Sequence, residues 1–309
     1  MRESNPEIIY RYQAFNALSL NALCHDQLYF SDPTNFNDPL DCNPAVERDS
    51  DRETLRQILS SLIQKRVEKE VTNSLQATNL TDKISNSHAK EQAQQSSENE
   101  LRRIEHYATN PDYTCSVEEA ECGMLHHGIH SELLKQNNRG ICCFSAEYSN
   151  PLLWSHYGDQ HKGFCVGYSL NRNPEPSLHK VLYGGARTIK TSLIAKAVLH
   201  HDIQAQKALD QNTLLRKAEP WQYEQEWRLI GEVGIQDSPL CLVEIIFGLR
   251  CSLSVIHAVM NALKPRDISF YQMSLTGDSF ELRRSDTEDC GQLPLTARSG
   301  IEIFGPCDD

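Results

Sequence analysis

Two carboxylates and a guanidinium stand close together in the stretch from Trp221 to Ile230, which reads WQYEQEWRLI. If this stretch is a β-strand, Glu224, Glu226 and Arg228 share one face, because successive side chains of a strand point to opposite sides. Aromatic and apolar side chains would cover the other face. A strand with a row of charges on one side either faces solvent or lines a cleft, so this stretch is our first candidate for a functional site.

Paired carboxylates are typical of glycoside hydrolysis when they face each other across a cleft. On one strand, Glu224 and Glu226 would lie about 7 Å apart. The chain has 42 acidic residues, however, so acids at this spacing also arise by chance. The alternative is a same-face ion pair between Glu226 and Arg228, which would be worth about 0–1 kcal/mol if exposed. The spacing leaves both interpretations open.

A second group of residues has the chemistry of a metal site. Cys122, His126 and His130 recur at every fourth position, which places them on one face of a helix, and Cys115 lies nearby. Their spacing is not that of a zinc finger. A polar helix that carries exposed histidines beside buried cysteines gives the same pattern, and we favour this structural interpretation over a metal site.

Serine and cysteine nucleophiles find less support. Ser145, Ser155 and His156 lie near the ends of predicted elements, and Cys142 and Cys143 are adjacent thiols. No GxSxG motif surrounds these serines, and nothing in the spacing selects a base for either thiol. The sequence therefore does not indicate a serine or cysteine hydrolase.

The composition is that of a globular protein. The 309 residues are 39% hydrophobic, which suffices for a core. The sequence has no run of eighteen apolar residues that would indicate a membrane span, and no apolar N-terminal segment that would indicate a secretory signal. We expect a cytoplasmic protein with no membrane partner, whose eleven cysteines are reduced. A net charge of −12 disfavours bulk binding of nucleic acid but is compatible with a local basic patch.

Short apolar strands and punctuated helices are predicted along most of the chain. The strands are expected at residues 8–12, 27–31, 140–145, 163–168, 180–183, 221–230, 240–247, 268–271 and 280–283, and the helices at 14–21, 150–158, 192–216 and 253–263. An amphipathic helix follows Ser50, a polar segment spans residues 72–99, and helical spacing resumes near Leu101. We predict one α+β domain over residues 1–309, with a mixed, largely antiparallel sheet and a helical insertion at residues 47–136.

The segment from Asp32 to Leu40 is dense in proline, asparagine and aspartate, and we expect a structured loop there. Such a loop can present polar side chains to a cleft, which makes Asn37 a candidate for binding a cofactor. In the alternative, Asn37 and Asp38 only hydrogen-bond to their own backbone, as in an Asx-turn.

The order and wording of several blocks resemble the bacterial DUF2971 family, a domain of unknown function that is often associated with bacterial defence and abortive infection. The blocks are Tyr10-Arg11-Tyr12, Leu28-Tyr29-Phe30-Ser31, Phe36-Asn37-Asp38-Pro39, Cys143-Phe144-Ser145, Leu153-Trp154-Ser155-His156-Tyr157-Gly158, Gly163-Phe164-Cys165-Val166-Gly167-Tyr168, Lys217 with Trp221, and Tyr223-Glu224-Gln225-Glu226-Trp227-Arg228.

A weaker resemblance, to ADP-ribosyltransferases, bears on mechanism. Those enzymes carry, in chain order, an arginine or histidine on an early strand, a serine, threonine or tyrosine after a middle strand, and a Glu-x-Glu or Gln-x-Glu on a late strand. This chain offers Arg11, then Ser145, then Glu224-Gln225-Glu226, although the Ser-Thr-Ser pattern of the arginine-modifying class is missing and the helical insertion separates the first two motifs. The resemblance implies a split-sheet fold and NAD as the substrate.

That resemblance also implies roles for the residues. Arg11 would hold the pyrophosphate or ribose of NAD, Ser145 would orient the motif, and Glu226 would bind the 2′-hydroxyl of the nicotinamide ribose. Glu224 would position or deprotonate the acceptor. Loss of nicotinamide passes through an oxocarbenium-like state, which a preorganised carboxylate stabilises. The aromatic candidates for stacking on nicotinamide or adenine are Tyr10, Tyr12, Trp154 and Tyr157.

We therefore expect an ADP-ribosyltransferase-like enzyme that transfers ADP-ribose from NAD to a macromolecular acceptor or hydrolyses NAD, in a setting of bacterial anti-phage defence. The alternative is a non-enzymatic module of a defence system. In that case the aromatic strands would form a ligand pocket and the helical insertion would bind a partner protein.

Overall fold

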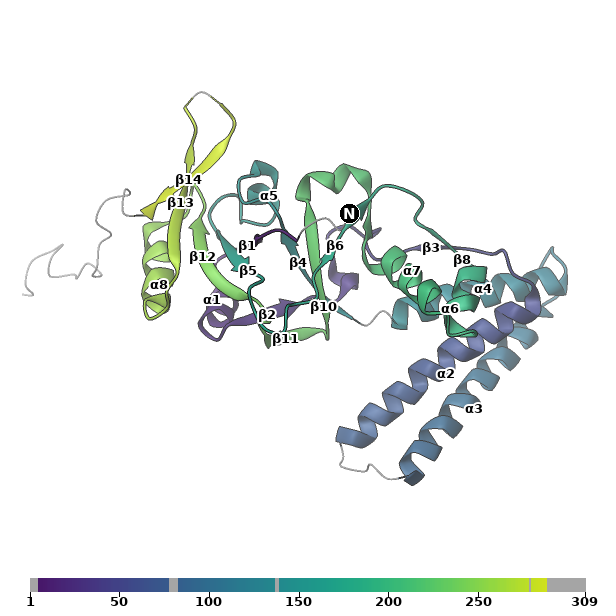
Figure 1. Cartoon of the computed structure of the whole chain (residues 1–309). Coiled ribbons are helices and arrows are strands. Elements are labelled where there is room, and N and C mark those ends of the chain that lie inside the picture. The colour runs from purple at the N-terminus through teal and green to yellow at the C-terminus, as the bar shows by residue number, and fades with distance from the viewer. Residues whose placement is uncertain (1–4, 78–82, 137–138, 278, 288–309) are drawn as a thin grey trace, which may run out of the picture. The chain divides into compact units, whose positions relative to one another are not determined.

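The computed structural model describes residues 5–77, 83–136, 139–277 and 279–287 of the chain (Figure 1). The contacts divide the chain into two compact units. The first unit contains Met1–Phe30, Ile141–Lys180 and Pro220–Asp309, and the second contains Ser31–Gly140 and Val181–Glu219. The helical segment predicted at residues 47–136 falls entirely within the second unit. The single domain over residues 1–309 stays a prediction.

An eight-stranded sheet forms the body of the first unit, in the order β14-β13-β12-β5-β1-β4-β10-β6. Its strands are β1 (Ile8–Gln13), β4 (Gly140–Ser145), β5 (Phe164–Ser169), β6 (His179–Lys180), β10 (Glu226–Gly231), β12 (Cys241–Phe247), β13 (Ser269–Leu275) and β14 (Leu282–Asp286). The pairs of β1 with β4 and with β5 are antiparallel, whereas β12 and β13 run parallel. The predicted mixed, largely antiparallel sheet of an α+β protein is confirmed.

Side chains alternate between two apolar layers, one on each face of this sheet. On one face, Ile9 and Phe144 pack with α1 (Ala17–Cys24) and α8 (Leu253–Leu263), which contribute Leu23 and Ile256. We call this the helix-covered face. The other face holds a smaller cluster built on Tyr10, Tyr12, Trp154 and Ile246, to which α5 (Pro151–His156) contributes Trp154. We call this the aromatic face.

The remaining elements of the first unit are short. Strands β2 (Gln27–Phe30) and β11 (Gly234–Asp237) pair antiparallel as a separate ribbon, and the 3-10 helix η2 (Glu219–Glu224) precedes β10. The helix α5 has the predicted punctuation, because the side chain of Asn150 accepts a hydrogen bond from the backbone of Leu152 and Pro151 occupies the first helical turn.

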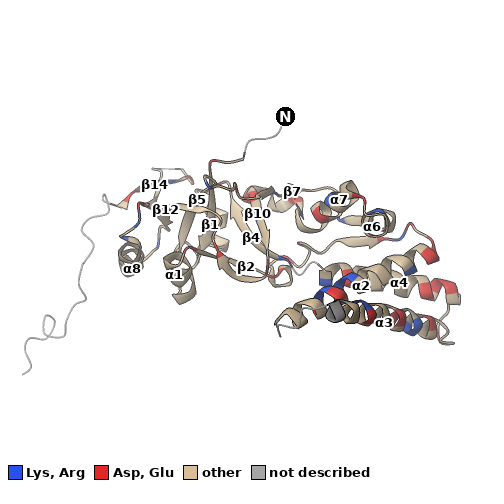
Figure 2. Cartoon of the chain, turned by 60° about the horizontal axis from the view of Figure 1, so that its bottom comes forward, with Lys and Arg blue, Asp and Glu red and all other residues tan. Residues whose placement is uncertain are grey.

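Helices dominate the second unit (Figures 1 and 2). It contains η1 (Pro33–Asn35), α2 (Arg52–Ala77), α3 (Lys83–Ala108), α4 (Val117–Gln136), α6 (Thr191–Val198) and α7 (Ile203–Leu214), with the paired strands β3 (Ala45–Glu47) and β8 (Thr188–Lys190), and β7 (Leu182–Tyr183) and β9 (Arg216–Lys217). Leucine, isoleucine and alanine side chains of these helices form one core. None of the described helices combines the length and the apolarity that a membrane span needs.

Two buried acids of α4 are neutralised by α2. Glu121 accepts from Arg52 and Arg56, whose nitrogens lie 3.3 and 2.6 Å from its oxygens. Glu132 accepts from Arg66 at 2.6 Å. Figure 2 shows the acidic and basic residues gathered along these helices. The polar composition of the insertion is thus partly used for ion pairs between helices.

Three predicted elements are interrupted in the structure. The helix expected at residues 192–216 breaks between Val198 and Ile203, where His201 has a positive φ of 52°. The strand expected at 180–183 is split into β6 and β7. The strand expected at 221–230 begins only at Glu226, because Trp221 to Glu224 belong to η2. This last correction changes the geometry of the candidate site.

Candidate functional site

The junction between η2 and β10 is held by side chains that come from the end of β4 and the start of α5. Ser145 Oγ donates to the backbone carbonyl of Glu224 at 2.6 Å, and Asn150 Nδ2 donates to the carbonyl of Tyr223 at 3.0 Å. Gln225 then takes a positive φ of 44°, a conformation that non-glycine residues rarely adopt. This turn ends the 3-10 helix and starts the strand, so Glu224 and Glu226 are not neighbours on one regular strand face.

Glu224 is a buried carboxylate with a phenol as a partner. Only 4% of its surface is exposed, and the hydroxyl of Tyr157 donates to its Oε1 at 2.8 Å. Tyr157 directly follows α5, whose N-terminus is fixed by Asn150. The same short helix therefore supplies both the tyrosine that contacts the carboxylate and the asparagine that holds the adjacent backbone.

Glu226 is also buried and is paired with Arg228 on the same strand. Arg228 Nε donates to Oε1 at 2.7 Å and Nη2 donates to Oε2 at 3.2 Å, and the arginine side chain is fully buried. Two parallel bonds of this kind fix the orientation of both groups. The ion pair weighed from the sequence is therefore present, but it is buried rather than exposed, and burial makes it costly to break.

Cys143 lies beside this ion pair. Burial, together with the neighbouring charge of Glu226, raises the pKa of the Cys143 thiol well above its ordinary value. A thiol in this environment stays protonated at neutral pH and is a poor nucleophile. Its position nevertheless shows that Glu226 and Arg228 point to the same face of the sheet as Cys143, which is the aromatic face.

Arg11 points to the opposite face. Its Nη1 donates to Cys142 Sγ at 2.8 Å and its Nη2 donates to the carbonyl of Tyr29 at 3.0 Å. Cys142 belongs to the core of the helix-covered face. The structure therefore brings Ser145, Glu224 and Glu226 together but does not bring Arg11 to them, and the predicted role of Arg11 at the carboxylates finds no support in its position.

Of the four aromatic residues predicted to stack on NAD, three lie in the core and one contacts a carboxylate of the site. Trp154 is fully buried, and Tyr12 packs against it edge to face, with ring centroids 5.1 Å apart. Tyr10 is 6% exposed and belongs to the same core cluster. These three side chains fill the core and offer no face on which a ligand could stack. Tyr157 is the one of the four predicted aromatic residues that contacts a carboxylate of the site.

A further aromatic group lies next to Tyr157. The ring of His156 packs against Trp221, with centroids 6.3 Å apart, and Trp221 lies 6.1 Å from the ring of Tyr223. The segment Trp221-Gln222-Tyr223 of η2 thus places aromatic side chains beside the carboxylates. The sequence analysis placed these aromatic side chains on one face of a strand, whereas the structure places them on a 3-10 helix.

Asn37 and the cysteine and histidine residues weighed as a metal site lie in the second unit. Asn37 is exposed and follows η1, and the carboxylate of its neighbour Asp38 accepts from the backbone of Leu40, as in an Asx-turn. His126 and His130 extend from α4 to the backbone carbonyls of Val46 and Pro44, at 2.9 and 3.0 Å. Within the described residues, no group of three or more histidine, cysteine or acidic side chains could hold a metal ion.

A buried acid of β12 also had not been predicted. Glu244 of β12 is 4% exposed and forms an ion pair with Arg284 of β14. Burial raises the pKa of Tyr10, and the nearby charge of Glu244 raises it further. Gly167 on the neighbouring strand leaves room for the Glu244 side chain, since a Cβ there would overlap its Cγ. A single acid within the apolar run Leu-Val-Glu-Ile-Ile-Phe was the available signal in the sequence.

Comparison with known proteins gives one match. Residues 153–229, from α5 to β10, are similar to the family described as "Protein of unknown function (DUF2971)". That segment contains Tyr157, Glu224, Glu226 and Arg228. No curated protein and no solved structure matches the chain. None of these comparisons supports the resemblance to ADP-ribosyltransferases, which stays an expectation from the sequence.

Proposed function

We propose that the junction of η2 and β10 is the catalytic centre of an enzyme that cleaves the bond between nicotinamide and ribose in NAD, and that transfers the ADP-ribose to a macromolecular acceptor or to water. The observation that carries this proposal is the pair of buried carboxylates, each held by a different donor: Glu224 by Tyr157, and Glu226 by Arg228. Buried, oriented carboxylates are suited to stabilising a developing positive charge.

In the proposed reaction, the bond from C1′ of the ribose to the nicotinamide nitrogen breaks, and its electron pair leaves with nicotinamide. Glu226 accepts a hydrogen bond from the ribose 2′-hydroxyl and stabilises the oxocarbenium-like transition state. The acceptor forms the new bond to C1′ and gives its proton to Glu224. Ser145 and Asn150 are positioning residues in this scheme, since they hold the backbone of Glu224 and Tyr223.

Two groups of residues that the sequence suggested for binding NAD have no catalytic role in the proposed reaction. Arg11 has no role in it, because it lies on the opposite face of the sheet from Glu226. Tyr10, Tyr12 and Trp154 serve the core. The anti-phage setting and the identity of the acceptor stay predictions that rest on resemblance.

Nicotinamide release from NAD tests the proposal directly. The purified chain should release nicotinamide, measured by chromatography, alone or with added protein and nucleic-acid acceptors. Glu224→Gln and Glu226→Gln should each lower the rate by about 100-fold or more, in line with the loss of a general base or of a charge-stabilising group. Glu118→Gln, an exposed acid of α4, is the matched control and should leave the rate unchanged.

Two outcomes would reject this function. One is the absence of nicotinamide release and of transferred ADP-ribose with every acceptor. The other is full activity in Glu226→Gln when circular dichroism and thermal unfolding show a folded protein. Either result would leave the buried acids with a structural role.

Ligand binding without catalysis is the second candidate function, and a pocket around Arg11 favours it. The pocket has a volume of about 300 Å³ and is lined by polar side chains such as Gln13 and Asn16 and by apolar ones such as Leu23. Tyr168 is also one of its lining residues. Among the described residues, no carboxylate forms an ion pair with Arg11.

A half-buried guanidinium without an ionic partner loses solvation that an anionic ligand would replace. The pocket therefore suits a small organic acid with an apolar body. Calorimetric titration with benzoate should detect binding, and Arg11→Gln should weaken it about 10-fold or more, as expected for a charged hydrogen bond. Arg283→Gln, an exposed arginine of β14, is the control. Equal binding by all three proteins would exclude the pocket.

A further inference from the structure

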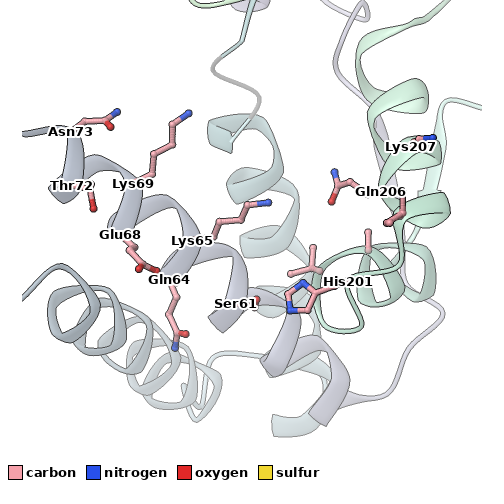
Figure 3. A pocket seen from close by; sticks show the side chains of 13 residues that line it. Ser61, Gln64, Lys65, Glu68, Lys69, Thr72, Asn73, His201, Gln206 and Lys207 are labelled. Carbon is pink, nitrogen blue, oxygen red and sulfur yellow. The ribbon is translucent and has the colours of Figure 1, made fainter. Parts of the chain in front are cut away.

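A groove in the second unit lies between α2 on one side and the α6–α7 pair on the other. Its volume is about 700 Å³. Figure 3 shows Lys65 and Lys69 extending from α2, with Gln206 and Lys207 on the wall formed by α7 and with His201 at the break between α6 and α7. All lining residues belong to this one unit.

The wall from α2 is a regular stripe of polar side chains. Ser61, Lys65 and Lys69 recur at every fourth position, and Glu68 and Thr72 follow Lys65 at spacings of three and four, which places them on one side of the helix. Lys65 and Lys69 are like charges one turn apart, an arrangement that costs an isolated helix a few tenths of a kcal/mol. An anion bound between them would turn this repulsion into attraction.

The lysines of the groove have no anionic partner within the described part of the chain. Lys65, Lys69 and Lys207 are all exposed and form no ion pair there. Arg66, by contrast, is held by Glu70 and Glu132. Glu70 and Glu132 are thus used by Arg66, and the groove lysines form no ion pair with either of them.

The local charge of the groove is opposite to that of the whole chain. Three lysines and one acid, Glu68, are among its described lining residues, so the balance is 3 − 1 = +2 with His201 neutral. The whole chain carries −12. A compact basic site within an acidic protein favours a small anion over a long polyanion, because the net charge repels a polymer at long range.

We propose that this groove binds a small ligand that carries a short chain of linked phosphates, with Lys65 and Lys69 on one side of the phosphates and Lys207 on the other. The ammonium groups of lysine are suited to phosphate as mobile point charges. The volume lies within the range of pockets that hold small molecules and cofactors. The buried side chains of Ala197 and Val198 give the groove an apolar base that a nucleoside could contact.

Two sources of this chemistry are a nucleoside triphosphate and an inorganic oligophosphate, and calorimetry on the full chain separates them. ATP and tripolyphosphate are titrated in parallel, with adenosine as the ligand that lacks phosphate. Tighter binding of ATP would identify a nucleotide site, whereas equal binding would identify a site for phosphate alone. In either case, raising the salt concentration from 50 to 200 mM should weaken binding.

Single variants assign the binding to the groove. Lys65→Gln, Lys69→Gln and Lys207→Gln should each weaken the binding of the tighter ligand by about 5- to 10-fold, as expected when one charge-assisted bond is lost. Lys90→Gln, an exposed lysine of α3 outside the groove, is the matched control and should bind like the parent chain. Because the three groove lysines are exposed, all four variants should keep the parent melting temperature.

The proposal is overturned if neither ATP nor tripolyphosphate binds, if adenosine binds as tightly as ATP, or if the three groove variants bind like the control. These outcomes are independent of nicotinamide release from NAD, which concerns residues of the first unit.

Discussion

The side-chain hydroxyl of Ser145 donates to the backbone carbonyl of Glu224 across 2.6 Å, and the same oxygen accepts from the backbone nitrogen of Glu147 at 2.9 Å. The serine that sequence spacing selected thus contacts the segment that carries the carboxylates, but it contacts the backbone. Its role is to hold the junction between η2 and β10, together with Asn150.

Removing this hydroxyl should destabilise the protein. Ser145→Ala removes a hydrogen-bond donor from the backbone carbonyl of the buried residue Glu224, and we expect the free energy of unfolding to fall by about 1–3 kcal/mol. Urea unfolding followed by tryptophan fluorescence measures the change. Ser87→Ala, in an exposed position of α3, is the control and should change stability by less than about 0.5 kcal/mol. A Ser145→Ala protein as stable as the parent would show that the junction does not depend on this bond.

The ion pair between Glu226 and Arg228 should behave as a buried pair. Arg228→Met removes two N–H donors from Glu226 and should lower the free energy of unfolding by about 3–5 kcal/mol. The double variant with Glu226→Gln should recover part of that loss, because the buried charge that has lost its arginine is gone. Urea unfolding of the single and double variants measures this coupling. Strictly additive losses would contradict it.

Close packing of Glu244 against the sheet predicts a strong effect at Gly167. A Cβ at this position overlaps Cγ of Glu244, so Gly167→Ala should cost about 1–3 kcal/mol. The control is Gly123→Ala in α4, where nothing lies within 4 Å of the added Cβ. That change should be neutral or stabilising by up to about 1 kcal/mol, since alanine is the better helix former. Thermal unfolding of both proteins distinguishes the two; a loss at Gly123 alone would contradict the packing argument.

His161 should make stability depend on pH. Burial, with the nearby charge of Arg250, lowers the pKa of His161, and its buried Nδ1 has no hydrogen-bond partner among the described residues. Between this lowered pKa and the value of about 6.5 in the unfolded chain, the unfolded chain binds more protons. The contribution of His161 to stability is therefore fully present above about pH 6.5 and is lost as the pH falls through the pKa of His161 in the folded protein.

The comparison of His161→Asn with the parent chain isolates this contribution. Asparagine tolerates the positive φ of 68° at this position. The stability of the parent relative to the variant should fall between pH 7 and pH 5, measured by urea unfolding at each pH. His88→Asn, an exposed histidine of α3, should show a constant difference. A constant difference for His161→Asn as well would contradict the assignment.

Local sequence signals were sufficient where an element is fixed by its own residues. Asn150 and Pro151 mark the start of α5, and the apolar run from Gly140 to Ser145 becomes β4, because caps and strand periodicity act over a few residues. The asparagine cap was predicted, but its second hydrogen bond, to the carbonyl of Tyr223, was not. That bond depends on two segments 73 residues apart.

The same limit explains the two corrections at the site. Alternation along β1 correctly places Tyr10 and Arg11 on opposite faces of the sheet. It does not say which of the two faces carries the side chain of Glu226 from β10. The order of the strands decides that question, and it is set by packing of the whole first unit. The 3-10 helix before Glu226 likewise replaces the expected strand because Ser145 and Asn150 hold its carbonyls, an interaction that no window of local sequence contains.

The position of β1 inside the sheet has a consequence during synthesis. This strand is made before both of its neighbours, β4 and β5, which come after the long helical segment. Arg11 and its contact Cys142 are 131 residues apart. At roughly 5–20 residues per second, the ribosome needs about 7–26 seconds to cover that interval. An apolar strand with two open edges attracts other strands. Nascent chains that stop within α2 to α4 should therefore aggregate, whereas chains released after β5 can cover both edges.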